Sequence, residues 1–557
     1  MNKHTFEPKI ISVLREGYSL PSLGKDLLAG LIVGIVALPL SIAIAIASGA
    51  KPEQGLITAF VAGLLISLLS GSRVQIGGPT GAFIIIVFGI SQKYGYDGLA
   101  AATVMAGILL VIMGFMRMGD VIKYIPYPVT VGFTSGIALV IFTTQIPDFF
   151  GVHLISTPAH FAAKWITYGQ NYTNTSPYAL ILGLLTILII RLWPRFDKRL
   201  PGTLIAILVT TGLVIWLKLP VETIASRFGE VPNRFPAPHL PHITIDMIIQ
   251  LASPAITIAL LAGIESLLSA VVADGMLGTK HRSNMELVAQ GVANIVSPIF
   301  SGIPATGAIA RTATNIKNGG RTPFAGIVHA FVILMLFLFC GKWAGLIPMP
   351  CLAGILIVVA YNMSEWRHFK RLLRSPQSDV LVLLLTFGLT VLVDLTVAIE
   401  VGVVLAALLF MHRMAESTHI DIIHDNDQNG RPHEYAGVPE GVEIFEINGP
   451  FFFGAVDKFR EALLSFKKLP KILILRMSAV PAVDASAVSS MERLIKEAKR
   501  DGTHIIIAGV SHKVFKTFHK SGLVERIGLE NILSDVSLAL AHAIVILEND
   551  ETAGRKS

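Results

Sequence analysis

The feature that most constrains this chain is a series of long apolar segments that continues from Leu27 to Met411. A helix needs about 20 mostly apolar residues to cross the roughly 30 Å hydrocarbon core of a bilayer. Only 15% of the residues are charged, against roughly a quarter in soluble domains. The sequence therefore predicts an α-helical protein that crosses a membrane many times. The predicted spans are 27–48, 56–69, 100–115, 129–145, 178–192, 204–217, 251–273, 287–300, 324–341, 352–361, 380–393 and 398–411.

Two shorter apolar pieces, 80–91 and 306–317, bring the number of predicted membrane elements to fourteen. Lys and Arg lie at the ends of the segments and are more frequent on one side, which is expected to be cytoplasmic. This places both termini, including an N-terminal segment of residues 1–24, in the cytoplasm of a multi-pass cell-membrane protein. The net charge of +7 is not gathered on one face or arm, so we expect no nucleic-acid partner.

A short sequence occurs twice, at matching places in the two halves of this region. Residues 79–82 read Pro-Thr-Gly-Ala and residues 305–308 read Ala-Thr-Gly-Ala, and each follows a stretch broken by Gly and Pro. Each is the third element of its half, and seven elements per half place the second half upside down relative to the first. We predict a transport domain of residues 25–413, built from inverted repeats of about 25–220 and 246–413. Matching interrupted segments indicate a binding site in such transporters. The alternative is a chance match of a common tripeptide.

These two segments are too short to span, because twelve helical residues rise only about 18 Å. Non-helical backbone is tolerated at membrane depth only where protein or a water-filled cavity covers it. We predict that each segment enters as extended chain and leaves as a half-helix whose N-terminus points inward. Two such N-termini would bind a small anion through unpaired N–H groups and their partial positive charge. The alternative is that the glycines only permit close helix packing. The predicted site residues are Gly78, Thr80, Gly81, Ala82, Thr306, Gly307 and Ala308.

Three charged or polar side chains near these segments are further candidates. Arg311 lies in the second half-helix, where it either adds positive potential beneath the anion or extends to the cytoplasmic headgroups. Glu265 is embedded in an apolar span, and a carboxylate there is costly, which favours a functional role such as proton coupling. The alternative is a structural anchor paired with Arg311 or capping a half-helix. Ser269, one turn later, lies on the same helix face as Glu265.

The C-terminal part reads as a soluble α/β domain. Apolar strand patterns such as 442–447 and 472–476 alternate with helix patterns such as 486–499, which predicts mostly parallel connections. We expect a linker at 414–433, the α/β domain at 434–550 and a tail at 551–557. The linker holds an Asn-Gly pair and a Pro, which favour turns.

The predicted membrane part of the chain resembles the sulfate permease (SulP) family of anion transporters. The resemblance rests on Ala-Leu-Pro at 37–39, Pro-Glu-Gln-Gly-Leu at 52–56, Gly-Ser-Arg at 71–73 and the block 304–312. The chain departs from the family at Gln54 and Ile57, where family members commonly have tyrosines. The resemblance implies a seven-plus-seven inverted repeat, a mobile core, a gate and a homodimer.

The same resemblance implies where a substrate would lie. It places the anion between the first, third and tenth elements, which adds Ile42, Ala43, Phe83 and Ala310 as lining residues. It also implies that Glu265 occupies the position of a coupling acid. Sodium-linked bicarbonate relatives tend to have Asp there, whereas Glu is more similar to proton-linked members.

The C-terminal domain resembles a STAS domain, the module of anti-sigma-factor antagonists. The matching stretch is residues 483–487, between a strand and a helix, and Ser486 corresponds to the serine that is phosphorylated in the antagonists, with Asp484 beside it. A phosphate at a helix N-terminus is electrostatically favourable. The alternative is that Ser486 only caps the helix. A cytoplasmic regulatory partner of this domain is expected.

The leading hypothesis is a secondary active transporter of small anions, with sulfate as the default substrate and bicarbonate or a C4-dicarboxylate as further choices. We expect H+ coupling and alternating access in the lipid bilayer, and no cofactor or metal. One alternative is a Na+-coupled bicarbonate symporter. An alternative of another class is a membrane receptor that signals through the STAS-like domain. An enzyme is not expected, because no nucleophile–base pair or metal cluster appears at usable spacing.

Overall fold

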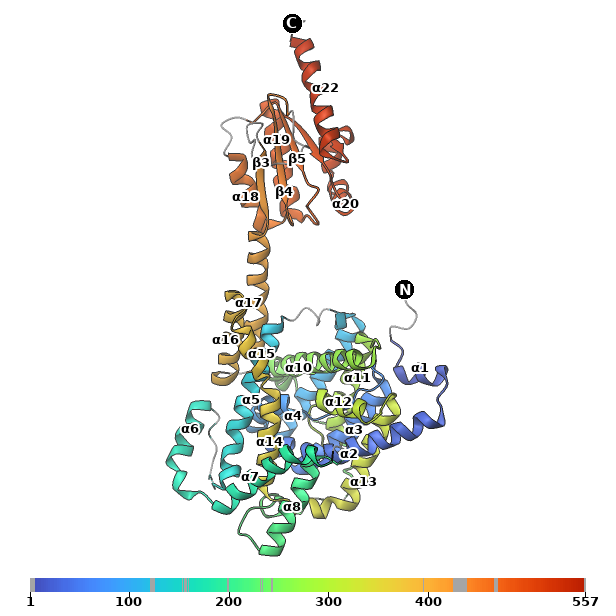
Figure 1. The fold of residues 1–557 in the computed structure, drawn as a ribbon, viewed down its shortest axis with the longest axis vertical. Coiled ribbons are helices and arrows are strands. Elements are labelled where there is room, and N and C mark those ends of the chain that lie inside the picture. Colours follow the sequence, from blue (N-terminus) through green and yellow to red (C-terminus); the bar gives the residue numbers. More distant parts are fainter. Residues whose placement is uncertain are drawn as a thin grey trace. The chain divides into compact units, whose positions relative to one another are not determined.

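The structure is a computed structural model that describes most of the 557-residue chain. It divides into two compact units, Met1–Ala406 and Ala407–Ser557, with the boundary inside one helix. Each unit is described by itself (Figure 1). The described residues are 6–120, 126–152, 154, 158, 160–197, 200–230, 232, 234–241, 244–393, 395–423, 438–464 and 469–554.

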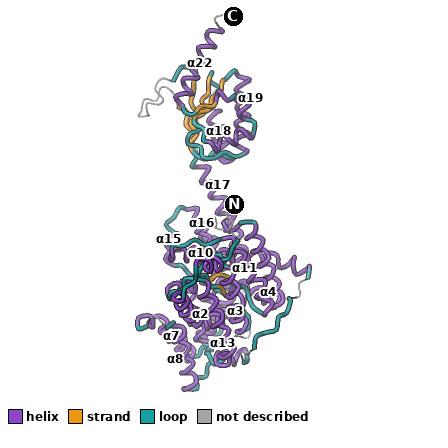
Figure 2. The backbone as a smooth tube through the Cα atoms, turned by 90° about the vertical axis from the view of Figure 1, so that its right-hand side faces the viewer, coloured by secondary structure: helices purple, strands orange, loops and turns teal. Residues whose placement is uncertain are grey.

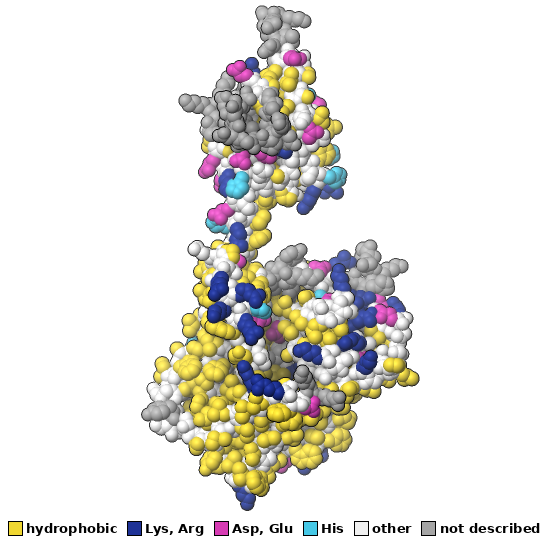
Figure 3. Space-filling view, viewed as in Figure 1, with side chains coloured by type: hydrophobic (Ala, Val, Ile, Leu, Met, Phe, Trp, Pro, Cys, Tyr) yellow, Lys and Arg dark blue, Asp and Glu magenta, His cyan; other side chains and the backbone are white. Residues whose placement is uncertain are grey.

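The first unit is almost entirely helical. Among the described residues, nine of its helices or helical stretches are long and apolar enough to cross a membrane. On the face shown in Figure 3, hydrophobic side chains cover much of the unit, and Lys and Arg side chains gather toward one end of it. The helices are α1 Lys9–Glu16, α2 Leu20–Ala47, α3 Pro52–Leu69, α4 Ile84–Phe115, α5 Tyr127–Phe150, α6 Phe161–Gln170, α7 Pro177–Leu192, α8 Gly202–Leu217, α9 Ile224–Phe228, α10 Ile245–Leu277, α11 Ser283–Val296, α12 Ile309–Lys317, α13 Pro323–Ala344, α14 Met349–Met363, α15 Trp366–Leu372, α16 Gln377–Leu392 and α17 Leu395–Glu416.

The predicted helical membrane fold is confirmed, although several boundaries move. The first membrane helix begins at Leu20, where Ser19 caps it and accepts a hydrogen bond from the backbone of Ser22, seven residues before the predicted start. The sequence also gave no indication of α6, which lies beyond the end of α5 in the chain order. The count of fourteen membrane elements stays a prediction.

Both short segments are interrupted, as the glycines and prolines suggested. In the first, Gly77 and Gly78 form a short strand, β1, which is followed by a turn at Gly81–Phe83 and then by α4. The helix α4 is itself broken at Gly95, which has a φ of 68° and a ψ of −170°. A glycine adopts this conformation at no steric cost. The half-helix therefore covers the residues between Ile84 and Gly95.

In the second segment, Thr306 and Gly307 form the strand β2, and α12 follows at once. The two strands pair antiparallel, Gly77 with Gly307 and Gly78 with Thr306. The pair lies among the helices of the first unit (Figure 2). An antiparallel crossing brings the two half-helix N-termini together from opposite directions, which is what oppositely oriented halves would do.

The second unit is an α/β domain around a five-stranded sheet. The strand order is β3-β4-β5-β6-β7, with β3 antiparallel to β4 and the other neighbours parallel. Two buried hydrophobic clusters lie on either side of the sheet, because alternate residues of a strand point to opposite faces. The elements are β3 His419–Ile423, β4 Val442–Asn448, α18 Phe453–Leu464, β5 Ile472–Arg476, α19 Ala485–Asp501, β6 His504–Ala508, α20 His512–Lys520, α21 Leu523–Ile527, β7 Ile532–Leu533 and α22 Val536–Gly554.

Residues 414–423, expected to be linker, form the end of α17 and the edge strand β3. The rest of that segment, 424–433, lies outside the described residues. The expected tail at 551–557 begins inside α22, and residues 555–557 also lie outside the described part of the chain.

Candidate functional site

The crossing of β1 and β2 is held by side chains from neighbouring helices. The amide of Ala308 donates to the carbonyl oxygen of Ile76 at 2.8 Å, next to the strand pair. Asn294 on α11 both accepts from the amide of Ala305, at 2.9 Å, and donates to its carbonyl, at 2.8 Å. Irregular backbone inside a membrane protein needs such partners. The sequence analysis did not single out Asn294, although a polar residue in an apolar span was the available signal.

One face of α10 makes hydrogen bonds to both broken segments. The backbone carbonyl of Ala262 accepts from the hydroxyl of Thr306 at 2.9 Å, and the backbone carbonyl of Ser266 accepts from the side-chain Nε2 of Gln75 at 3.1 Å. Glu265 and Ser269 lie between and beyond these carbonyls on the same face, since residues three and four apart are neighbours on a helix. Helix α10 therefore connects the first segment to the second.

Glu265 contacts the first segment directly. Its carboxylate Oε2 accepts a hydrogen bond of 2.9 Å from the hydroxyl of Thr80, and its side chain is only half-buried. No ion pair joins Glu265 to Arg311 among the described residues, so the predicted anchoring pair is wrong. In the described contacts, Glu265 accepts from a side-chain hydroxyl and not from a backbone amide of a half-helix. The alternative in which Glu265 caps a half-helix is therefore also wrong for these contacts.

Ser269 turns toward the second segment. Its side chain is fully buried and its hydroxyl lies 3.2 Å from the hydroxyl of Thr312 on α12. Thr312 in turn accepts from the amide of Ile76 at 3.1 Å. Ser269 thus shares a helix face with Glu265, as expected, but it fixes the crossing through α12.

The repeated tripeptide does not give equivalent positions. Thr80 follows β1 and stands before the turn at Gly81–Phe83, whereas Thr306 lies inside β2 and is fully buried. The Thr306 hydroxyl donates to Ala262, so the expectation that both hydroxyls serve the same pocket is corrected. The reason is that the half-helix of the second segment begins fewer residues after its strand than the half-helix of the first segment does.

Two groups of backbone amides at the crossing have no acceptor among the described residues. In α12 the first backbone donor with a helical acceptor is Thr312, which donates to Ala308, so the amides of Ile309, Ala310 and Arg311 remain free. In the first segment the amide of Phe83 donates to Thr80, which leaves those of Gly81 and Ala82. Free N–H groups at helix starts carry partial positive charge and favour anions.

Arg311 adds a full positive charge at the same place. It is the third residue of α12, its exposed fraction is 3%, and Nη2 donates to the carbonyl oxygen of Pro79 at 2.8 Å. Among the described residues, its Nε and Nη1 have no hydrogen-bond partner. The alternative in which Arg311 extends to the cytoplasmic headgroups is therefore wrong, because the guanidinium points back across β1.

The lining residues implied by the family resemblance differ in exposure. Ile42, Ala43, Phe83 and Ala82 are buried, whereas Ala310 is exposed and its neighbour Ile309 is 41% exposed. Glu265 is partly buried. In this structure the start of α12 is thus the accessible part of the crossing, and the start of α4 is covered.

Close approach of the two strands, β1 and β2, depends on glycine. A Cβ on Gly307 would lie 1.7 Å from Nε2 of Gln75, and a Cβ on Gly78 would lie 2.5 Å from Nη1 of Arg311. Gly78 also has a φ of 150°, which side chains rarely adopt. Gly307 is therefore restricted by space, and Gly78 by space and by conformation.

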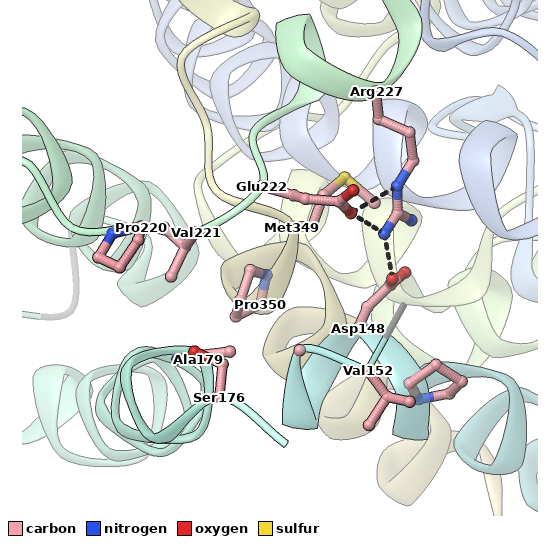
Figure 4. A pocket seen from close by; sticks show the side chains of 12 residues that line it. Asp148, Val152, Ser176, Ala179, Pro220, Val221, Glu222, Arg227, Met349 and Pro350 are labelled. Atoms are coloured by element: carbon pink, nitrogen blue, oxygen red, sulfur yellow. Dashed lines mark hydrogen bonds and ion pairs between the residues drawn. The ribbon is translucent and has the colours of Figure 1, made fainter. Parts of the chain in front are cut away.

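A second charged group lies at the end of the first unit where α2 ends and α10 begins, which is called the outer end below. Arg227 of α9 lies between two carboxylates, with Nη2 2.7 Å from Asp148 and Nε 2.9 Å from Glu222 (Figure 4). The adjacent cavity measures only about 30 Å³. Because the guanidinium is already paired with two negative groups, it does not attract a further anion.

In the second unit, Asp484 caps α19. Its Oδ1 accepts from the amide of Ala487 at 2.8 Å and its Oδ2 from the amide of Phe453 at 3.0 Å. Ser486 is exposed in the first turn of α19, and its side chain makes no hydrogen bond that the structure records. The capping role therefore belongs to Asp484, which corrects the alternative that Ser486 is the cap.

Comparisons with known proteins match both parts of the chain. The sulfate permease family matches residues 23–386, and the STAS domain matches residues 436–539. YvdB of Bacillus subtilis strain 168, provisionally named a sulfate transporter, is 42% identical over 518 residues, covering 93% of this chain and 97% of that protein. The bicarbonate transporter BicA of Picosynechococcus is 31% identical over 544 residues, covering 93% and 94%.

Solved structures agree in fold. SLC26A9 superposes with a TM-score of 0.87 over 98% of this chain and 94% of its own, at 19% identity, which is a likeness of fold alone. The transmembrane domain of a cyanobacterial BicA superposes with a TM-score of 0.61 at 30% identity, covering 70% of this chain and 98% of its own. With the broken segments, the antiparallel crossing and the C-terminal α/β unit in place, the chain belongs to the sulfate permease family and carries a STAS domain.

Proposed function

We propose that the protein is a secondary active transporter of small anions that works by alternating access. The observation that carries the proposal is the group of unpaired donors at the crossing of β1 and β2. The free amides of Gly81, Ala82, Ile309 and Ala310 and the unpaired Nε and Nη1 of Arg311 come from both halves of the chain. Preorganised donors of this kind favour a bound anion.

Sulfate is the default substrate in this proposal. YvdB carries the name of a sulfate transporter and the BicA relatives carry the name of bicarbonate transporters. Both anions present several oxygens that can accept from N–H groups, and a C4-dicarboxylate does so as well. The identity with YvdB is the higher of the two, which favours sulfate.

Proton coupling through Glu265 completes the proposal. The carboxylate lies on the helix that contacts both broken segments, and its one recorded partner is the hydroxyl of Thr80. A group that bonds to the first segment and is only partly buried can exchange a proton next to the substrate site. The alternative is a Na+-coupled bicarbonate symporter. The proposal also includes a homodimer and a cytoplasmic regulatory partner of the STAS domain.

The test is uptake of labelled sulfate, bicarbonate and succinate by the purified chain in proteoliposomes, with pH and sodium gradients imposed separately. The proposal expects concentrative uptake of sulfate driven by an inward proton gradient and unaffected by sodium. Accumulation of bicarbonate that follows the sodium gradient would establish the alternative. Tight anion binding without net flux under either gradient would instead support a receptor that signals through the STAS domain.

A further inference from the structure

A large cavity at the outer end of the first unit has basic side chains in its lining. It measures about 430 Å³ and lies between the half-helix at the start of α4 and residues of α5, α6, α10 and α16. Three basic side chains reach it: Lys93 at the end of the half-helix, His160 before α6 and Lys164 within α6. None of the described residues that line it is Asp or Glu.

Lys164 is the unusual member of this group. Its exposed fraction is 6%, yet it has no carboxylate partner within ion-pair distance among the described residues. Its Nζ lies 5.7 Å from the centre of the Phe88 ring on the half-helix. Burial lowers the pKa of the Lys164 ammonium, because desolvation disfavours the charged form. A buried ammonium without a partner is costly, and an anion in the cavity would offset that cost.

The contrast with Arg227 shows that pairing is available at this end of the molecule. Arg227 is also an outer-end cation, and it has Asp148 and Glu222 as partners. Lys164 and Lys93 instead have aromatic neighbours, Phe88 and Tyr94, whose rings bind a cation without neutralising it. The positive charge in the cavity therefore remains available to a ligand.

The cavity also reaches the half-helix that begins at the crossing. Its lining includes Ile84, the first residue of α4, which directly follows the turn at Gly81–Phe83. Ile84 and Phe83 are both buried, and the free amides of Gly81 and Ala82 lie in the turn that directly precedes Ile84.

We infer that this cavity is a second, outer site for a small anion, in which the Lys164 ammonium and the nearby Lys93 hold the anion beside the covered face of the central crossing. Binding at this site is independent of the proposed function. Only the claim that a bound anion is then passed to the crossing rests on the proposed function.

The direct test measures the local charge with a cysteine in the cavity. Gly89 lines the cavity, and a Cβ built on it meets no atom within 4 Å, so Gly89→Cys fits without a clash. Cys340 is replaced by Ala, while the buried Cys351 stays because a buried thiol is inert. The full-length protein reacts with an anionic methanethiosulfonate, the ethylsulfonate, and a cationic one, the ethyltrimethylammonium, and the ratio of the two rate constants is recorded.

We expect Lys164→Gln to lower the anionic-to-cationic ratio about tenfold, since one nearby unit charge changes each rate constant about threefold in opposite directions. Lys164→Arg should keep the ratio, which separates charge from folding. Lys342→Gln, at an exposed lysine on the outer end of α13, is the matched control and should leave the ratio unchanged. Millimolar sulfate should slow the anionic reagent in the parent protein and not in Lys164→Gln.

A ratio that is the same in the parent and in Lys164→Gln, with both proteins folded, overturns the inference. So does protection by sulfate that persists in Lys164→Gln, which would mean that Lys164 does not hold the sulfate. Sulfate transport then tests the passage of the anion. Lys164→Gln should raise KM about tenfold for sulfate supplied at the outer end, with the maximal rate kept and the KM from the opposite side unchanged. If the parent protein moves no sulfate, the proposed function fails while the labelling result still decides the outer site.

Discussion

Arg311 donates from Nη2 to the carbonyl oxygen of Pro79 at 2.8 Å, across a separation of 232 residues in the chain. One half of the protein thus places its cation on the broken backbone of the other half. The hydrogen bond uses one nitrogen of the guanidinium, and Nε and Nη1 have no partner in the described part of the chain. The cation therefore both supports the crossing and is available to a ligand.

Arg311→Gln should raise KM for sulfate at least about tenfold, because a charge-assisted hydrogen bond contributes about 1.5–3 kcal/mol. Arg311→Lys keeps the charge and should show a smaller increase. Lys317→Gln, at an exposed lysine in the last turn of the same helix, is the control and should leave KM unchanged. Labelled uptake over a range of sulfate concentrations measures the effect. An unchanged KM in a folded Arg311→Gln protein would remove the residue from the binding site.

Glu265→Gln should abolish accumulation driven by a pH gradient while leaving anion binding in place. The glutamine oxygen can still accept from Thr80, so the contact between α10 and the first segment survives, but the group no longer takes up a proton. Asp246→Asn, at an exposed carboxylate in the first turn of the same helix, controls for a general loss of negative charge. Uptake with and without an imposed pH gradient gives the answer. A Glu265→Gln protein with the parental pH dependence would refute the coupling role.

Gly307→Ala should destabilise the crossing, because the new methyl group would overlap Nε2 of Gln75. Overpacking of this kind costs about 1–3 kcal/mol and should lower the thermal unfolding temperature of the purified protein. Combining it with Gln75→Ala removes the clash, so the double variant should be more stable than the sum of the single effects predicts. Gly212→Ala in α8 meets no atom within 4 Å and should have no such effect. Additive losses in the double variant would contradict the proposed overlap.

Asp484→Ala should loosen the start of α19 in the second unit, since the amides of Ala487 and Phe453 lose their acceptor. Loss of an N-cap costs about 0.5–2 kcal/mol, which corresponds to roughly fivefold faster hydrogen exchange at the first turn of α19.

Ser486→Ala should leave exchange unchanged, and Ser486→Asp should slow it slightly because a negative charge is favourable at a helix N-terminus. Sulfate uptake should persist in both Ser486 variants. A complete loss of uptake in folded Ser486→Ala would contradict a purely regulatory role.

The sequence predicted the membrane fold well because the apolar content of each segment indicates whether that segment lies in lipid or in water. Runs of apolar residues specify spans, and the Gly and Pro residues before Thr80 and Thr306 marked the two interruptions. Element boundaries were less accurate, as at Leu20, since polar residues such as Asp26 continue the helix beyond its apolar part. Asp26 is fully buried and accepts hydrogen bonds from Arg321 and Thr322 at the start of α13, which no local pattern indicates.

The site was predicted in outline and missed in its pairings. Two contacts were missed: Arg311 donates to Pro79, and Thr306 donates to Ala262 instead of lying opposite Thr80. Both depend on the register of two strands that are far apart in the chain. Register is set by three-dimensional packing, so a repeated tripeptide cannot reveal it. The sequence did not indicate the burial of Lys164, because that burial depends on a short helix, α6, that the sequence did not predict.

The pairing of Gly77 with Gly307 also has a consequence for biosynthesis. These partners are 230 positions apart, and a ribosome adding about 5–20 residues per second needs about 10–50 s between them. During that interval the first half resides in the bilayer with the polar backbone of its extended stretch unmatched. An unmatched backbone is unfavourable in hydrocarbon, so the nascent first half must shelter it temporarily, either with water or with an insertase. We therefore expect ribosome-bound chains that stop before Gly307 to be sensitive to quality-control proteolysis.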